Sequence, residues 1–123
     1  MDNYASYLPH INAEEGIKRI MNNKKLYVSM LTRFKLDEMT AALLEAISSN
    51  DAEKIVFAAH ALKGAAGNLG LPTLQELTGV MEQAAKDAAK EGNNVLAVYN
   101  VEGLVALVGE LKPLLARFVQ DEA

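Results

Sequence analysis

The sequence contains no cysteine and no tryptophan, and it has only three prolines and two histidines. Without cysteine there is neither a disulfide framework nor thiol catalysis, and a zinc site would need carboxylates beside the histidines. The missing cysteine fits a reducing compartment, so we expect a cytoplasmic protein. No apolar run approaches the roughly 20 residues that cross a bilayer, and the first residues lack the basic and apolar regions of a signal peptide. We therefore expect no membrane partner.

A basic surface is also missing, since the formal net charge is −4. Binding to nucleic acid requires clustered Lys and Arg to neutralise phosphates, and the sequence shows no such stripe. We therefore expect no nucleic-acid partner.

Hydrophobic residues make up half of the 123 residues, which is enough for one domain with its own core. Apolar residues recur at spacings of three and four from Ile11 onward, and no alternating strand pattern is present. We predict a single all-α domain over residues 1–123, an antiparallel up-down four-helix bundle with a short additional N-terminal helix. The short helix is predicted at 12–22 and the bundle helices at 24–48, 51–69, 72–91 and 94–119.

Polar and special residues at the helix ends support these boundaries. Asn12 with Glu15 forms a potential capping box, and Asn50 or Asp51 can cap the third predicted helix. Gly70 is a natural terminating residue, and proline at position 72 suits a first turn. The predicted buried positions of the first two helices include Ile17, Ile20, Met21, Leu26, Met30, Phe34 or Leu36, Met39, Leu43 and Ile47.

The helix predicted at 51–69 divides into two faces when it is projected at about 100° per residue. The predicted core face comprises Ile55, Ala58, Leu62, Ala65 and Leu69, with Ala59 and Ala66 beside it. His60 points nearly opposite Leu69, so we expect its ring at the surface. A lone surface histidine usually has no function, and the interpretation of His60 therefore depends on its neighbours.

Two glycines lie close to His60 inside this helix, at Gly64 and Gly67. Each costs roughly 0.5 to 1 kcal/mol relative to alanine, which indicates that space is being kept free near the ring. The alternative is close packing against a neighbouring helix, and it applies more to Gly67. Lys63 can bring a cation to any group on the ring, although a solitary exposed lysine is normally a solvated residue.

Apolar side chains precede the histidine by one turn, at Val56 and Phe57. Together with the glycines they would form a flat, partly apolar surface suited to a protein partner. Gly67 and Asn68 would shape this surface. The alternative is that a flanking helix or the N-terminal segment covers Phe57.

The pattern of His60, Leu62, Lys63, Gly64 and Gly70 resembles the signature of histidine-containing phosphotransfer (HPt) domains. The resemblance extends over most of the chain. It includes residues 16–20, Tyr27 with Leu31 and Phe34, residues 49–53, residues 69–74, and the pair Met81 and Glu82.

The resemblance implies that Nε2 of His60 accepts a phosphoryl group from a receiver-domain aspartate and passes it to another receiver aspartate. It further implies that Lys63 helps to hold the phosphoryl group, that Gly64 leaves room for the receiver, and that Glu82 hydrogen-bonds the other ring nitrogen. The implied partners are response-regulator receiver domains and a hybrid sensor histidine kinase. No cofactor is implied on this chain, because Mg²⁺ belongs to the receiver. We expect a monomer, since a two-fold dimer through the His60 face would bury the site.

Three other functions fit the sequence less well. A phosphorylation-independent adaptor could dock a receiver or kinase, but such a chain would more naturally have lost His60 or Lys63. A kinase would need an ATP-binding pattern that is missing, and a metal-binding bundle would need inward carboxylates and a Glu-x-x-His pair. We expect His10 to be an ordinary exposed loop residue. The sequence does not distinguish a free-standing protein from a piece of a larger hybrid kinase, although we take the initial methionine and the C-terminal residues to favour a free-standing chain.

Overall fold

The computed structural model describes residues 4–91 and 100–123, and these residues form helices and turns without β-strands. The all-α prediction is confirmed. None of the helices in these two ranges is long and apolar enough to cross a membrane. The elements are a 3₁₀ turn η1 (Ala5–Tyr7) and the α-helices α1 (Ala13–Arg19), α2 (Lys24–Arg33), α3 (Leu36–Ser49), α4 (Ala52–Asn68), α5 (Pro72–Glu91) and α6 (Val101–Glu122).

Local capping starts α1 and α4 where the sequence predicts it. The Asn12 side chain accepts a hydrogen bond from the backbone N–H of Glu15 at 3.2 Å. The Asp51 carboxylate accepts from the backbone N–H of Glu53 at 3.1 Å. Each bond satisfies an N–H group that has no partner within its helix.

The turn between α4 and α5 is closed by Gly70, which has a positive φ of 68°. The N–H of Leu71 donates to the carbonyl of Ala66 at 2.9 Å, and this bond ends α4. The carbonyl of Gly70 accepts from the N–H of Asn12 at 2.7 Å, and a Cβ at position 70 would lie 2.6 Å from the Asn12 carbonyl oxygen. The N-terminal segment therefore holds this short turn in place. The turn sets the direction in which α5 runs back along α4.

The single helix predicted at 24–48 is wrong, because the chain forms two helices that are separated at Phe34 and Lys35. Phe34 adopts an extended conformation with ψ 122°. Leu31 and Leu36 are both buried, yet five positions on one straight helix would separate them by about 140°. The break turns both leucines toward the core.

The first helix also ends earlier than predicted, at Arg19 rather than residue 22. Met21 is largely exposed and has a positive φ, so its predicted burial is wrong. Leu26 is exposed as well, and Tyr27 is buried in its place with its hydroxyl donating to the Leu69 carbonyl at 2.6 Å. A Cβ at Gly16 would overlap the Tyr27 ring, so this glycine makes room for it.

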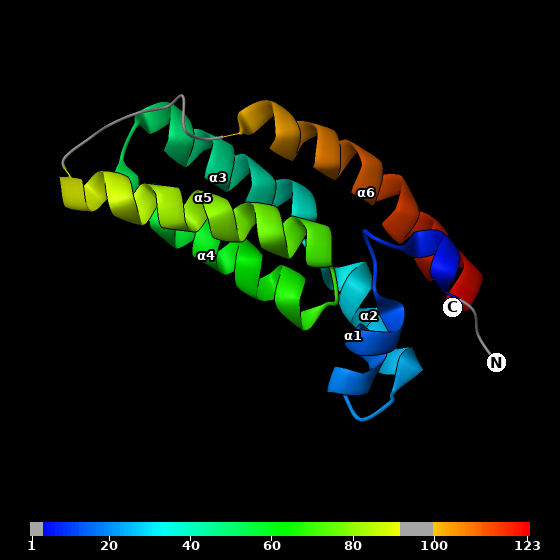
Figure 1. The fold of residues 1–123 in the computed structure, drawn as a ribbon. Helices are drawn as coiled ribbons and strands as arrows, with labels where there is room; N and C mark the ends of the chain where they lie inside the picture. The colour runs from blue at the N-terminus through cyan, green and yellow to red at the C-terminus, as the bar shows by residue number, and fades with distance from the viewer. Residues whose placement is uncertain (1–3, 92–99) are drawn as a thin grey trace.

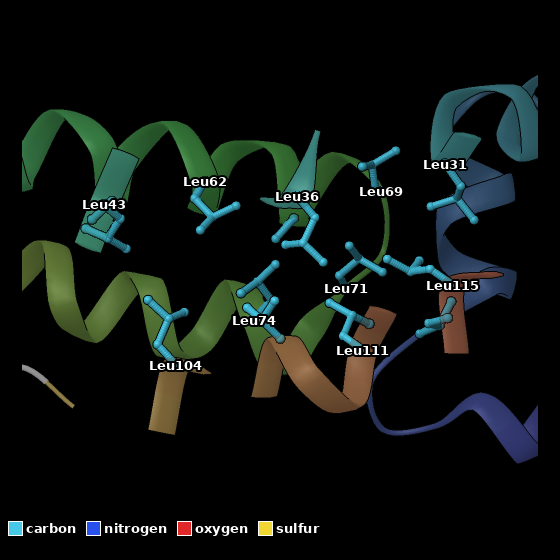
Figure 2. Close-up of a cluster of buried hydrophobic side chains, with 14 of the residues drawn as sticks. Leu31, Leu36, Leu43, Leu62, Leu69, Leu71, Leu74, Leu104, Leu111 and Leu115 are labelled. Atoms are coloured by element: carbon cyan, nitrogen blue, oxygen red, sulfur yellow. The ribbon is translucent and has the colours of Figure 1, made fainter. Parts of the chain in front are cut away.

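The long helices pack around a core that is rich in leucine. α4 lies beside α5 and also contacts α3, while α6 contacts α2, α3 and α5 (Figure 1). Figure 2 shows leucines of all four long helices approaching one another, and the labelled members of the cluster include Leu43, Leu62, Leu74, Leu104 and Leu111. Because this core covers one face of α4, side chains on the opposite face of the helix remain exposed to solvent.

The last helix was predicted to start at residue 94, which lies outside the described residues. It ends at Glu122 rather than at the predicted residue 119.

His10 differs from the expectation of an ordinary exposed residue. Its Nδ1 lies 2.8 Å from Oγ1 of Thr73, and its Nε2 lies 3.0 Å from a carboxylate oxygen of Glu110. The side chain is mostly buried because Tyr7 and Ile11 on either side anchor this segment in the core. His10 therefore links the N-terminal segment to α5 and α6.

Candidate functional site

His60 lies on the face of α4 that is turned away from the core. Its side chain is 69% exposed. Ile55, Ala59, Leu62 and Ala66 are buried on the other face, whereas Ala58 and Ala65 are only partly buried. The buried face is therefore turned slightly from the predicted one, toward Ala59 and Ala66, and His60 still projects into solvent.

Glu82 reaches the His60 ring from the neighbouring helix α5. Its side chain is only 4% exposed, and its Oε2 atom lies 2.7 Å from Nδ1 of His60. The two residues meet because the Gly70 turn brings α5 back along α4. A carboxylate at this depth needs compensating partners, since burial of an unpaired charge is costly.

Two lysines supply that compensation. Lys63 Nζ donates to Oε1 of Glu82 at 2.8 Å, and Lys86 Nζ lies 3.5 Å from Oε2. The Lys63 hydrogen bond is the main cause that lowers the pKa of Glu82 to about 2, and the His60 hydrogen bond and the charges of both lysines add to it. Burial acts in the opposite direction and is outweighed. Glu82 is therefore ionised near neutral pH.

The ionised carboxylate determines which nitrogen of His60 carries the proton. A carboxylate can only accept a hydrogen bond, so Nδ1 of His60 must be the donor to Glu82. In the neutral ring Nε2 then keeps a lone pair, and no described residue forms a hydrogen bond with it. An exposed imidazole held in this tautomer presents a nucleophile to solvent.

The two glycines near His60 have different surroundings. A Cβ at Gly64 would meet no atom within 4 Å, so the space over this turn of α4 is open. A Cβ at Gly67 would lie 2.8 Å from Nε2 of Gln75, at the end of a flexible side chain on α5. A Cβ at Gly67 would therefore require the Gln75 amide to shift, whereas a Cβ at Gly64 would require no movement of a neighbour. Asn68 is exposed at the end of α4.

The two apolar residues before His60 also differ. Val56 is partly buried and packs against the core, while Phe57 is 79% exposed. None of the described helices covers Phe57, which lies at the edge of a groove between α3 and α4. Phe57 and the open surface at Gly64 flank His60 on the same helix.

Two residues of the site were not identified from the sequence. Lys86 lies one turn after Glu82 on α5, a spacing at which opposite charges meet. Gly79 lies one turn before Glu82, and a Cβ there would be 3.4 Å from Cδ of Lys63. A Cβ at Gly79 would make an ordinary van der Waals contact with the Lys63 stem, so only a longer side chain there would crowd it. Both residues lie three or four positions from Glu82, so their spacing in the sequence would have placed them near Glu82 on the same helix.

Metal chemistry is not suggested by the side chains of residues 4–91 and 100–123. Within these ranges no group of three or more His, Cys, Asp or Glu is arranged to hold a metal ion. Glu82 makes its close contacts with one imidazole and two ammonium groups.

A comparison with protein families identifies the family to which most of the chain is similar. A family model described as Hpt domain matches residues 31–120, a range that contains His60, Lys63, Gly64 and Glu82. No curated protein and no solved structure matches the chain.

Proposed function

This chain belongs to the Hpt domain family, and on that premise we propose that His60 accepts a phosphoryl group from a receiver-domain aspartate and passes it to another receiver aspartate. Hpt domains are phosphotransfer carriers of two-component phosphorelays rather than kinases. The observation that carries the proposal is the hydrogen bond between Nδ1 of His60 and the buried carboxylate of Glu82. It directs the free lone pair of Nε2 toward an approaching phosphoryl group.

The transfer balances without a cofactor on this chain. The Nε2 lone pair attacks phosphorus, the bond between phosphorus and the aspartyl oxygen breaks, and the carboxylate leaves with the electron pair. Nδ1 keeps its proton, so the phosphorylated ring carries a formal positive charge beside two negative charges on the phosphoryl oxygens. Glu82 stabilises this positive ring through the same hydrogen bond. The reverse sequence returns the phosphoryl group to a second receiver, and Mg²⁺ would belong to the receiver.

The residues around His60 have separate proposed roles. Lys63 supplies positive charge beside the phosphoryl group, as well as keeping Glu82 ionised. Gly64 leaves space for the receiver, which the open surroundings of its Cβ position support. The receiver-docking surface would comprise Val56, Phe57, Gly64, Gly67 and Asn68.

We propose one domain whose four long helical segments form an antiparallel up-down bundle, and a monomer, because a dimer through α4 would cover His60. The partners would be response-regulator receiver domains and a hybrid sensor histidine kinase. The cytoplasmic location accords with the absence of cysteine.

The experiment is phosphoryl transfer from a set of purified phosphorylated receiver domains to the full chain. Wild type should gain an acid-labile, base-stable phosphoryl group, whereas His60→Gln should gain none. Because the His60 ring is largely exposed, His60→Gln should keep its helicity and melting temperature. His10→Gln is the matched control, since it removes the other histidine and should still be phosphorylated.

The outcomes separate the carrier from an adaptor. Labelling of wild type and His10→Gln, but not of His60→Gln, supports the carrier and names a partner. Binding of folded wild type to a receiver without any transfer would instead favour a phosphorylation-independent adaptor that docks a receiver or kinase. A large loss of stability in His60→Gln would contradict its exposed position.

A further inference from the structure

Lys86 is held less tightly by Glu82 than Lys63 is. Its ammonium lies 3.5 Å from Oε2 of Glu82, which is longer than an ordinary hydrogen bond. Its side chain is 53% exposed, compared with 38% for Lys63. Lys63, in contrast, donates to Glu82 Oε1 at 2.8 Å. Lys86 can therefore move at lower cost than Lys63.

The resting cluster carries an excess of positive charge. One buried carboxylate, that of Glu82, is shared by the ammonium groups of Lys63 and Lys86 and by Nδ1 of His60. With a neutral imidazole, these charges leave one uncompensated positive charge beside the ring. This arrangement suits an incoming anion.

Phosphorylation of His60 would change which positive groups interact with Oε2 of Glu82. The phosphorylated ring gains a positive charge at the side that donates to Oε2 of Glu82, the same oxygen that Lys86 approaches. At the same time two negative charges appear on the phosphoryl oxygens at Nε2. Both changes favour movement of Lys86 from Oε2 to the phosphoryl group, while Oε1 and its bond to Lys63 are unaffected.

We infer that Lys86 is a second residue that contacts the phosphoryl group. Its ammonium lies beside Glu82 in the unphosphorylated protein and moves to the phosphoryl oxygens when His60 is phosphorylated. This inference rests on the proposed carrier function and deepens it. Lys63 then keeps its hydrogen bond to Glu82, which holds the carboxylate ionised. Lys86 moves and brings its positive charge to the phosphoryl group, so the two lysines have different roles at His60.

The test uses the full chain with phosphoramidate, a small phosphodonor that requires no receiver. The P–N bond of phosphoramidate breaks, a bond forms between phosphorus and Nε2 of His60, and ammonia leaves. Wild type is compared with Lys86→Gln, with Lys86→Arg as the charge-conserving rescue. Lys90→Gln is the matched control, because Lys90 is exposed one turn further along α5.

Removal of the Lys86 charge should slow labelling by about three- to tenfold, because an exposed cation near a dianion contributes modestly. The labelling rate should also depend less on ionic strength in Lys86→Gln than in wild type. Lys86→Arg should restore most of the rate, and Lys90→Gln should match wild type. Helicity, melting temperature and the ¹⁵N signals that report the His60 tautomer should be unchanged, which distinguishes a phosphoryl contact from a structural role.

These measurements distinguish a failure of the role of Lys86 from a failure of the carrier function of His60. If wild type is labelled and Lys86→Gln equals it in rate and salt dependence, the role of Lys86 is overturned while the carrier function stands. Slower labelling of Lys86→Gln together with an altered tautomer would make Lys86 a support for Glu82 and would also overturn the inference. If wild type accepts no phosphoryl group from phosphoramidate or from any receiver, the carrier function and the role of Lys86 both fail.

Discussion

Glu82 and His60 are 22 positions apart in sequence, yet the Glu82 carboxylate lies 2.7 Å from Nδ1 of the His60 ring. The carboxylate is buried and the ring is exposed. Changes to Glu82 should therefore affect both stability and chemistry, whereas changes to His60 should affect chemistry far more than stability, because Lys63 and Lys86 remain as partners of the carboxylate.

Replacement of Glu82 by Gln should introduce a pH-dependent loss of stability. The pKa of Glu82 is lowered from 4.5 to about 2 in the folded protein, so its ionised form stabilises the fold above about pH 4.5. That contribution is lost as the pH falls through about 2. At neutral pH we expect Glu82→Gln to lower the free energy of unfolding by about 1 kcal/mol, because its partners are partly exposed.

Urea unfolding of wild type and Glu82→Gln between pH 7 and pH 2 tests this prediction. The difference between the two proteins should shrink across the acidic range. A difference that stays constant with pH would show that the Glu82 charge does not stabilise the fold.

Gly64→Gln should separate docking from chemistry. The open surroundings of Gly64 should accept the side chain, and loss of a helix-interior glycine should raise the free energy of unfolding by about 0.5 to 1 kcal/mol. Transfer from a receiver should fall by about tenfold or more, since the new side chain occupies docking space. Labelling by phosphoramidate should persist.

The matched control is Gly109→Gln, another helix-interior glycine with open surroundings. It should gain similar stability and keep receiver transfer. Equal transfer by the Gly64 and Gly109 variants would remove Gly64 from the docking surface.

A larger residue at Gly79 should disturb Glu82 through Lys63. Gly79→Ala adds a methyl group at 3.4 Å from Lys63 Cδ, a contact that should be tolerated. Gly79→Leu should displace the Lys63 stem, and because the Lys63 hydrogen bond is the main cause of the low pKa of Glu82, that pKa should rise toward 4.5. Titration of the Glu82 carboxyl carbon by NMR measures the shift directly. An unchanged pKa in Gly79→Leu, with Gly109→Leu as the control, would contradict the proposed fit.

Leu62→Ala tests the orientation of α4. Leu62 is fully buried, so its truncation should cost about 2 to 5 kcal/mol in the free energy of unfolding. The same change at the exposed Leu26 should cost about 1 kcal/mol or less. Denaturant unfolding of both variants gives the comparison, and a neutral Leu62→Ala would mean that α4 is rotated.

Local chemistry accounts for what could be predicted about helix ends. The caps at Asn12 and Asp51 and the termination at Gly70 depend on residues within one turn of each other, so the sequence contains the necessary information. The exposure of His60 follows from helical projection alone, because α4 is a regular helix over 17 residues.

Long-range packing accounts for the errors. Nothing local required the break at Phe34, which arises because Leu31 and Leu36 both enter the core. The burial of Tyr27 depends on space left by Gly16 and on the Leu69 carbonyl, and the position of His10 depends on contacts from α5 and α6.

The sequence by itself determined the helical class, most helix ends and an exposed histidine flanked by Lys63 and Gly64. Its resemblance to a family pointed to Glu82, but a helix projection cannot place one helix against another. Only the tertiary structure decided that Glu82 meets Nδ1 of His60, that Lys86 approaches the same carboxylate and that Gly79 lies beside the Lys63 stem. These contacts either join α4 to α5 or depend on the rotation of α5 about its axis. The Gly70 turn and the shared leucine core determine how the two helices pair and how α5 is rotated.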